Sequence, residues 1–538
     1  MWSRVDEPAH YDVIAQYASG VYPHDSVTTV RPETLEIMQR TGNYGFVVDG
    51  AYQRPDGFVA MPEGLTDAQH VLWVRRHVWQ YSYEAFQPPL YYALAVPAWK
   101  VGDALGGAFG AVYAVRVFDA LLAALLAPLA MLLALRLSTL PGAGWGAAVL
   151  TAFMPGVDAN LTSVTNDVLV AVLGAVTVVV SLSGRPTMRR ALIVGGLLGC
   201  AMLAKTTAIA LVPAVVVALA WRGRIASALA ALGTAVLIVA PWLLSNLAIY
   251  GELITTREQT AMSAFPQRTG ALDFWSVSTL HSFVTFWSGD PFLSLSTAVP
   301  LALLATVLCA LAIAGLVRAP RNIELLVLAL AAAGAVLVSV TSPVLAAFNA
   351  PGRLAYVGLT AVTALVACGL WIELTSWRLR RAAVALFAAV SVVGLAVLAY
   401  PQAPSSPSDP GHPVIDRSNP LSASGSFGNV SFDLQTCAVD PHGDAWLGVF
   451  IENFGATPAE WSQTAEVRSG GETLATSDYS RSTPFPMTLP AGFQLTGWLF
   501  LGPPGRFSRA GPLTVRFRAI AAGGYRSIGD VVIATPLC

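Results

Sequence analysis

The sequence predicts a polytopic α-helical membrane protein of about ten spans, followed by a C-terminal β-sandwich domain outside the cytoplasm. Hydrophobic residues make up 55% of the 538 residues, charged residues only 12%, and the mean hydropathy is +0.59. Long apolar runs with short polar breaks extend from about residue 89 to 400, whereas residues after about 427 alternate apolar and polar positions. A soluble chain of this size has no interior large enough for so much apolar surface.

The arginines in the polar breaks predict which side of the membrane each break faces. Eleven arginines lie in alternate breaks: Arg136, Arg185, Arg189, Arg190, Arg222, Arg224, Arg318, Arg321, Arg378, Arg380 and Arg381. Cytoplasmic loops are enriched in Lys and Arg, so these breaks are predicted to face the cytoplasm. The ten predicted spans cover residues 115–136, 143–160, 166–183, 190–204, 206–221, 226–249, 297–317, 323–341, 354–375 and 382–400.

The domain organisation follows from these spans. Residues 89–103 are apolar but contain Pro97 and Lys100, which predicts an interfacial or re-entrant helix, with a true span as the alternative. The predicted domains are a first extracytoplasmic loop with interfacial helices, a transmembrane helical domain, a Pro/Ser linker and the β-sandwich domain, at residues 1–103, 104–400, 401–426 and 427–538.

The tail carries short strand-like segments: "VSFDLQ", "WLGVFIENF", "LTVRFRAI" and "DVVIAT". Gly, Pro and Asn separate them, as is typical of a β-sandwich. Outside the cytoplasm Cys437 and Cys538 are predicted to form a disulfide, which would stabilise the domain by up to ~4–5 kcal/mol; the alternative is two unpaired thiols. The other cysteines lie in apolar runs and are predicted to be packing residues.

Uncommon polar residues gather on the predicted outer side. The net charge of −1 argues against a nucleic-acid-binding protein. The candidate site residues are Asp6, Glu7, His10, Glu84, Gln87, Asp167, Lys205 and Arg353. Polar groups at membrane depth are costly and tend to face cavities. Carboxylates and cations around one cavity suit one reaction type: a carboxylate deprotonates an acceptor hydroxyl while cations hold a phosphate leaving group.

An ordered series of motifs carries a resemblance to a known class. The motifs are "DEPAH", "QPPLYY", "TNDVLVAV", "LAKTTAIALVP", "NLAIYGELI", "SFVTFWSGDPF" and "APGRLAYVGL", between about residues 6 and 360. The chain resembles the GT-C glycosyltransferases, which include protein O-mannosyltransferases and aminoarabinose transferases, and most closely a poorly characterised branch of that class. Members normally have a span before the acidic motif, whereas five residues precede Asp6 here, so we expect the native product to be longer.

The resemblance implies roles for the first motif. Asp6 matches the catalytic carboxylate that deprotonates the acceptor; a helix-capping Asp is the alternative. Glu7 is implied as a second catalytic carboxylate or as a local hydrogen-bonding group. His10 is implied to orient a carboxylate or to contact the donor phosphate, and an ordinary surface histidine is the alternative. Glu84 and Gln87 precede the Pro-Pro pair, and relatives often have His where Gln87 stands.

The later motifs supply a second acidic position and two cations. Asp167 is implied to bind the acceptor, the donor or a metal, and a helix N-cap is the alternative. Lys205 and Arg353 are implied to hold the lipid phosphate, with snorkelling cations as the alternative.

The implied activity is inverting transfer of a sugar at the outer face of the cytoplasmic membrane. The partners are a polyprenyl-phosphate-linked sugar donor, a glycan, lipid or protein acceptor, and membrane lipid. No cofactor is required by the pattern, and a divalent metal is compatible with it. The alternatives are a transporter or flippase for a lipid-linked glycan, although no internal repeat is evident, and a non-catalytic scaffold of envelope assembly.

Overall fold

The computed structural model describes most of the helical region and the strands of the tail. The described residues are 7–22, 31, 34, 82, 84–185, 187–221, 225–255, 271–289, 295–346, 352–399, 417–440, 443–455, 457, 459–461, 464–469, 472–477, 482, 488–489, 494–503, 512–521 and 524–533. They fall into two compact units, a helical unit up to residue 399 and a strand unit from residue 417. Each unit is described by itself.

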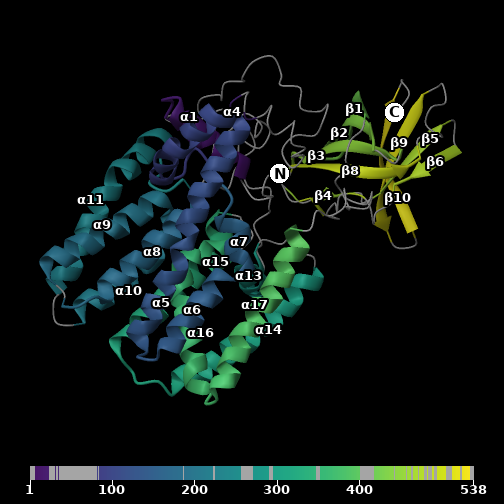
Figure 1. Ribbon diagram of the computed structural model, residues 1–538. Helices are drawn as coiled ribbons and strands as arrows, with labels where there is room; N and C mark the ends of the chain where they lie inside the picture. Colours follow the sequence, from purple (N-terminus) through teal and green to yellow (C-terminus); the bar gives the residue numbers. More distant parts are fainter. Residues whose placement is uncertain are drawn as a thin grey trace. The chain divides into compact units, whose positions relative to one another are not determined.

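The described part of the helical unit contains α-helices and two 3₁₀ segments (Figure 1). These are α1 (Glu7–Ala18), α4 (Leu90–Ala124), α5 (Leu126–Leu137), α6 (Pro141–Ala152), α7 (Pro155–Leu161), α8 (Asp167–Leu182), α9 (Met188–Ala204), η2 (Thr206–Leu211), α10 (Val212–Ala220), α11 (Ile225–Tyr250), α13 (Ala271–Ser288), α14 (Leu295–Val317), α15 (Ile323–Ala346), η3 (Gly352–Gly358), α16 (Leu359–Glu373) and α17 (Trp377–Ala399).

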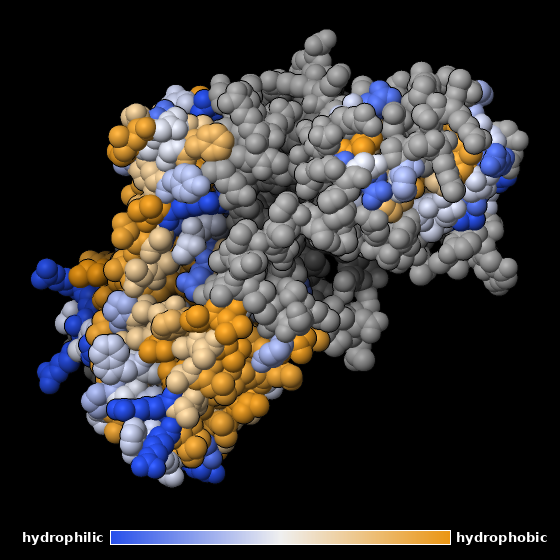
Figure 2. Space-filling model, turned by 45° about the vertical axis from the view of Figure 1, so that its right-hand side comes forward, coloured by the Kyte–Doolittle hydropathy of each residue, from blue (hydrophilic) through white to orange (hydrophobic). Residues whose placement is uncertain are grey.

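Five helical stretches among the described residues are long and apolar enough to cross a membrane. They are Leu90–Leu137, Ile225–Tyr250, Val299–Val317, Ile323–Thr341 and Gly352–Glu373, and two shorter apolar helices are Asp167–Leu182 and Thr206–Ala220. Figure 2 shows hydrophobic residues over much of the visible surface of the helical unit. Leu121, Leu237 and Leu303 are 67%, 75% and 63% exposed. Exposed apolar surface on long apolar helices is typical of a multi-pass membrane protein.

Breaks interrupt the described helices at three places, one inside a predicted span and two between predicted segments. α4 leaves helical geometry at Gly106 and Gly107, and Gly107 has φ +60°, a conformation that favours glycine. The predicted span 143–160 is two helices, because Pro155 begins α7 after a break at Phe153 and Met154. The chain between α9 and η2 is extended at Lys205. Such breaks are tolerated at membrane depth where protein surrounds them.

The described residues of the strand unit form two four-stranded antiparallel sheets with the orders β1-β2-β3-β8 and β10-β9-β5-β6, and a small β4-β7 pair. The strands are β1 (Arg417–Phe427), β2 (Val430–Val439), β3 (Ala445–Asn453), β4 (Ala459–Glu460), β5 (Thr464–Ser469), β6 (Glu472–Thr476), β7 (Thr488–Leu489), β8 (Gln494–Gly502), β9 (Leu513–Ala521) and β10 (Gly524–Ile533).

The two large sheets share one hydrophobic core. At its centre the rings of Phe432 on β2 and Phe517 on β9 have centroids 4.6 Å apart, and Trp461 packs on both. A shared core between two sheets is the packing that defines a sandwich. Strand β3 departs from the expected alternation, since Trp446 is buried on its other face against Phe500.

Candidate functional site

The segment Val164–Asp167, which leads into α8, connects buried polar groups of the helical unit. The Val164 N–H donates to Glu7 Oε1 at 2.9 Å, and the Thr165 N–H donates to Asp119 Oδ2 at 3.4 Å. The Thr165 hydroxyl donates to Asp167 Oδ2 at 3.3 Å. Three carboxylates from α1, α4 and α8 are therefore held by one short stretch of chain, which contains the predicted Asn-Asp motif.

Glu7 is a fully buried residue that fixes the start of α1. Arg116 of α4 donates from Nε to Oε1 at 2.7 Å and from Nη2 to Oε2 at 2.6 Å. Together with the Val164 N–H, these bonds occupy both carboxylate oxygens. A two-point Arg–carboxylate pair is strong and directional, so it holds α1 against α4 in one orientation.

His10 lies one helical turn further along α1 and is also buried. Its Nδ1 is 2.9 Å from the Tyr92 hydroxyl and 3.7 Å from Glu84 Oε2, and it interacts electrostatically with Asp167. The Gln87 N–H donates to the Glu84 carbonyl oxygen at 3.1 Å, which closes a turn before the Pro-Pro pair. The "DEPAH" and "QPPLYY" motifs therefore meet. His10 is 1% exposed, so the surface-histidine alternative is wrong.

Asp167 is the centre of a buried ion cluster. Lys205 Nζ donates to its Oδ1 at 2.6 Å, and Arg353 Nη1 is 3.8 Å from its Oδ2. The N-cap of α8 is Asn166, and the Asp167 side chain pairs with the cations, so the cap alternative is wrong. Lys205 is 8% exposed and pairs internally, so the snorkelling alternative is wrong for it.

Local backbone features bring the two cations to Asp167. Lys205 stands at the break between α9 and η2, where the chain is extended. Arg353 follows Gly352, whose N–H donates to the Thr285 hydroxyl of α13 at 2.7 Å. A Cβ at Gly352 would overlap the α13 backbone. The Gly-Arg motif thus consists of a residue that must lack a side chain and a cation that it positions.

The Asp167–Lys205–Arg353 cluster, as we call these three residues, has two fixed positive charges and one negative charge. Lys205 and Arg353 side chains are 10% and 15% exposed, so each retains some accessible surface. A cation that water screens poorly attracts anions strongly. Among the described residues no group of three His, Cys, Asp or Glu side chains is arranged to hold a metal ion.

Three further polar residues belong to this region: Asp119 and Tyr91 are buried, and Arg116 is partly buried. Arg116 and Asp119 lie inside the predicted span 115–136, and charged residues within spans are a signal of function that the sequence did offer. Tyr91 of the "QPPLYY" motif is fully buried and donates to Asp119 Oδ2 at 2.8 Å.

Two candidate residues lie outside the described part of the chain. These are Asp6 and Cys538. Cys437 is disulfide-bonded, and its pairing with Cys538 stays a prediction. The described cysteines Cys200, Cys309 and Cys368 have free thiols. Comparisons with protein-family profiles, with curated proteins and with solved structures found no match.

Proposed function

We propose that this protein is a membrane glycosyltransferase of the GT-C type, which moves a sugar from a polyprenyl-phosphate donor to an acceptor at the extracytoplasmic face. The observation that carries the proposal is the buried Asp167–Lys205–Arg353 cluster. Lys and Arg together suit a phosphate, Lys as a point charge and Arg as a planar two-point donor. Asp167 keeps both cations in place without cancelling their charge.

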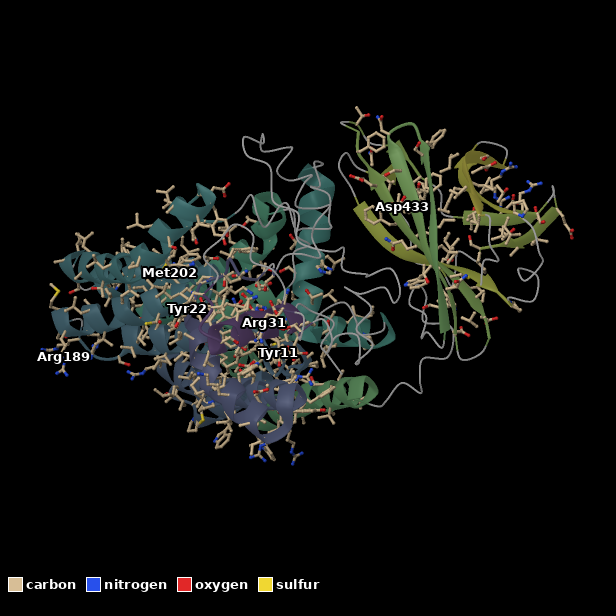
Figure 3. All side chains as sticks on the ribbon, turned by 90° about the horizontal axis from the view of Figure 1, so that it is seen from above. Tyr11, Tyr22, Arg31, Arg189, Met202 and Asp433 are labelled. Atoms are coloured by element: carbon tan, nitrogen blue, oxygen red, sulfur yellow. The ribbon has the colours of Figure 1, made fainter. Side chains whose placement is uncertain are left out.

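The placement of charge along α8 and α9 supports an outward-facing site. Asp167 and Lys205 meet at one end of this helix pair, whereas Arg185 and Arg189 lie at the other end, about 24 Å away for a 16-residue helix. Figure 3 shows Arg189 at the outer edge of the helical unit, away from Tyr11 of α1. By the positive-inside rule the arginine end is cytoplasmic. The ten-span topology and the extracytoplasmic C-terminal domain belong to this proposal.

The reaction assigns each group a task. Asp6 takes the proton of the acceptor hydroxyl as its oxygen attacks the anomeric carbon, and the bond from that carbon to the phosphate oxygen breaks. The bond electrons leave with the polyprenyl phosphate, whose negative charge Lys205 and Arg353 stabilise. Direct displacement inverts the anomeric centre. Glu7 is a positioning residue, because its bonds to Arg116 fix the helix that begins one residue after Asp6.

A binding experiment tests the phosphate site. Purified protein in lipid nanodiscs is titrated with polyprenyl phosphate that carries no sugar. We expect Lys205→Gln and Arg353→Gln each to weaken binding by at least about tenfold, because each removes a charge-assisted hydrogen bond. Arg189→Gln, at the exposed opposite end of α9, is the matched control and should bind normally. Unchanged binding by both cluster variants would overturn the proposed phosphate site.

A transfer experiment then separates an enzyme from a flippase or a scaffold. Membrane vesicles from cells that lack the protein receive wild type or Asp6→Asn, together with polyprenyl phosphates that carry radiolabelled hexoses or pentoses. We expect labelled acceptor with wild type only, while Asp6→Asn still binds polyprenyl phosphate. Movement of the lipid across the bilayer without transfer would favour the flippase, and transfer by Asp6→Asn would exclude Asp6 as the base.

A further inference from the structure

Two buried polar side chains beside the ion cluster have hydrogen-bonding capacity that nothing in the described chain uses. Asn166 is completely buried, and neither its amide oxygen nor its amide nitrogen has a partner among the described residues. Asp119 is also completely buried, and its Oδ1 likewise has no partner there. The unmatched atoms are therefore one donor group, the Asn166 amide nitrogen, and two acceptors, the Asn166 amide oxygen and Asp119 Oδ1.

Such groups are costly to keep in a folded protein. A buried polar group without a partner costs about 1–3 kcal/mol, and most buried polar atoms are satisfied. The neighbouring carboxylates obey this rule, since Glu7 accepts from Arg116 and Val164, and Asp167 accepts from Lys205. The unmatched atoms of Asn166 and Asp119 differ in this respect from the carboxylates of Glu7 and Asp167, which calls for a specific explanation.

A short run of contacts links Asp119 and the backbone around Asn166 to the Asp167–Lys205–Arg353 cluster. Asp119 Oδ2 accepts from the Tyr91 hydroxyl at 2.8 Å and from the Thr165 N–H at 3.4 Å, which orients the carboxylate. Thr165 in turn donates to Asp167, and Asn166 stands between Thr165 and Asp167 in the chain. Asn166 and Asp119 are thus connected through one residue to the Asp167–Lys205–Arg353 cluster.

The chemistry of the unmatched atoms fits hydroxyl groups. A hydroxyl is both a donor and an acceptor, so a sugar ring can donate to the Asp119 and Asn166 oxygens and accept from the Asn166 amide. We propose that Asn166 and Asp119 form a subsite that binds hydroxyls of the donor sugar next to its phosphate, and so selects sugar-bearing over bare polyprenyl phosphate. This inference rests on the proposed function and deepens it.

The test compares two ligands on the same protein in nanodiscs: bare polyprenyl phosphate and polyprenyl phosphate that bears mannose, glucose or arabinose. Wild type should bind at least one sugar-bearing lipid about tenfold more tightly than the bare lipid, as expected for two or three added hydrogen bonds. Asn166→Leu and Asp119→Asn should reduce this preference severalfold or more and leave the affinity for bare polyprenyl phosphate unchanged.

Thermal unfolding distinguishes this role from a structural one. Asn166→Leu should be at least as stable as wild type, because it removes an unmatched amide. Asn160 is a matched control, because its amide nitrogen donates to the Gly156 carbonyl at 2.9 Å and to the Tyr356 hydroxyl at 3.3 Å. Asn160→Leu should therefore lower the melting temperature and keep the sugar preference.

The outcomes separate the two proposals. If neither lipid binds wild type, the proposed function fails and the subsite fails with it. The subsite alone is wrong if bare polyprenyl phosphate binds but a sugar does not increase the affinity. It is also wrong if Asn166→Leu and Asp119→Asn both retain the preference for the sugar-bearing lipid. In either case the unmatched atoms of Asn166 and Asp119 bind water instead.

Discussion

At the scale of single residues, Asp12 is the buried carboxylate that ties the first loop to α1. It accepts from Gln16 Nε2 at 2.7 Å, the Arg31 N–H at 3.0 Å, the Thr34 hydroxyl at 2.7 Å and the Ser82 hydroxyl at 2.8 Å. Ser82 lies just before the "QPPLYY" motif, so Asp12 joins both ends of the loop to the helix that carries Glu7 and His10. Its network is structural, and its titration should appear in the stability of the protein.

Burial raises the pKa of Asp12 above its usual value, although the bonds from Thr34 and Ser82 act in the opposite direction. The folded protein then binds this proton more tightly than the unfolded chain does. The contribution of Asp12 to the free energy of unfolding therefore falls as the pH rises from ~4 through the raised pKa, and it is constant at higher pH. Asp12→Asn lacks this contribution. We expect the melting temperature of wild type minus that of Asp12→Asn to be largest at about pH 4 and to shrink towards pH 8.

Thermal unfolding in detergent across this pH range measures the effect. Ser82→Ala removes one partner but keeps the carboxyl group, so its melting temperature should follow pH as wild type does, at a lower level. A difference between wild type and Asp12→Asn that is constant with pH would contradict the prediction.

Residue-level partners were only partly predictable. Asp167, Lys205 and Arg353 were grouped because each stands at the predicted outer end of its helix, and the structure places both cations within 3.8 Å of the Asp167 carboxylate. The pair of Glu7 with Arg116 joins residues that are 109 positions apart. Charge patterning carries no information on such a pair, because it depends on how α1 packs against α4.

At the scale of elements, hydrophobic runs located helices well but not their interruptions. Each of the ten predicted spans overlaps one helix or consecutive helical segments, while five stretches among the described residues are long and apolar enough to cross a membrane. Strand β1 begins at Arg417, before the predicted domain start at 427, although "RSNPLSASGSF" has little apolar content. This segment is a strand because it pairs with β2 in antiparallel fashion. The β-propensity of its own residues does not predict such a pairing, which depends on tertiary context.

Gly352 gives a prediction at this scale. Since a Cβ there would meet the α13 backbone, Gly352→Ala should push η3 away from α13 and carry Arg353 from Asp167. We expect weaker binding of bare polyprenyl phosphate, approaching the loss in Arg353→Gln, although every charged group is retained. Gly233→Ala is the matched control in α11, because a Cβ at Gly233 meets nothing within 4 Å; alanine also favours a helix by about 1 kcal/mol. Normal binding by Gly352→Ala would show that the packing of η3 against α13 does not position Arg353 for phosphate binding.

At the scale of the whole molecule, two independent features indicate the same orientation. Arginines 378, 380 and 381 lie at the start of α17, and the strand unit follows the other end of that helix. The positive-inside rule therefore predicts that the strand unit is extracytoplasmic. Cys437 of β2 is disulfide-bonded, and disulfides persist in oxidising compartments. Both features predict that the strand unit is extracytoplasmic, which is the side to which the proposed function assigns the active site.

Labelling with a membrane-impermeant maleimide on intact cells tests this orientation. The free thiols Cys200, Cys309 and Cys368 are replaced by alanine, and one cysteine is introduced at Val532 of β10 (64% exposed) or at Arg318 after α14 (side chain 66% exposed). We expect Val532→Cys to react in intact cells and Arg318→Cys only after the membrane is permeabilised. The reverse pattern would place the arginine-rich ends outside. The Asp167–Lys205 end of α8 and α9 would then face the cytoplasm, where a donor that acts at the outer face cannot reach it.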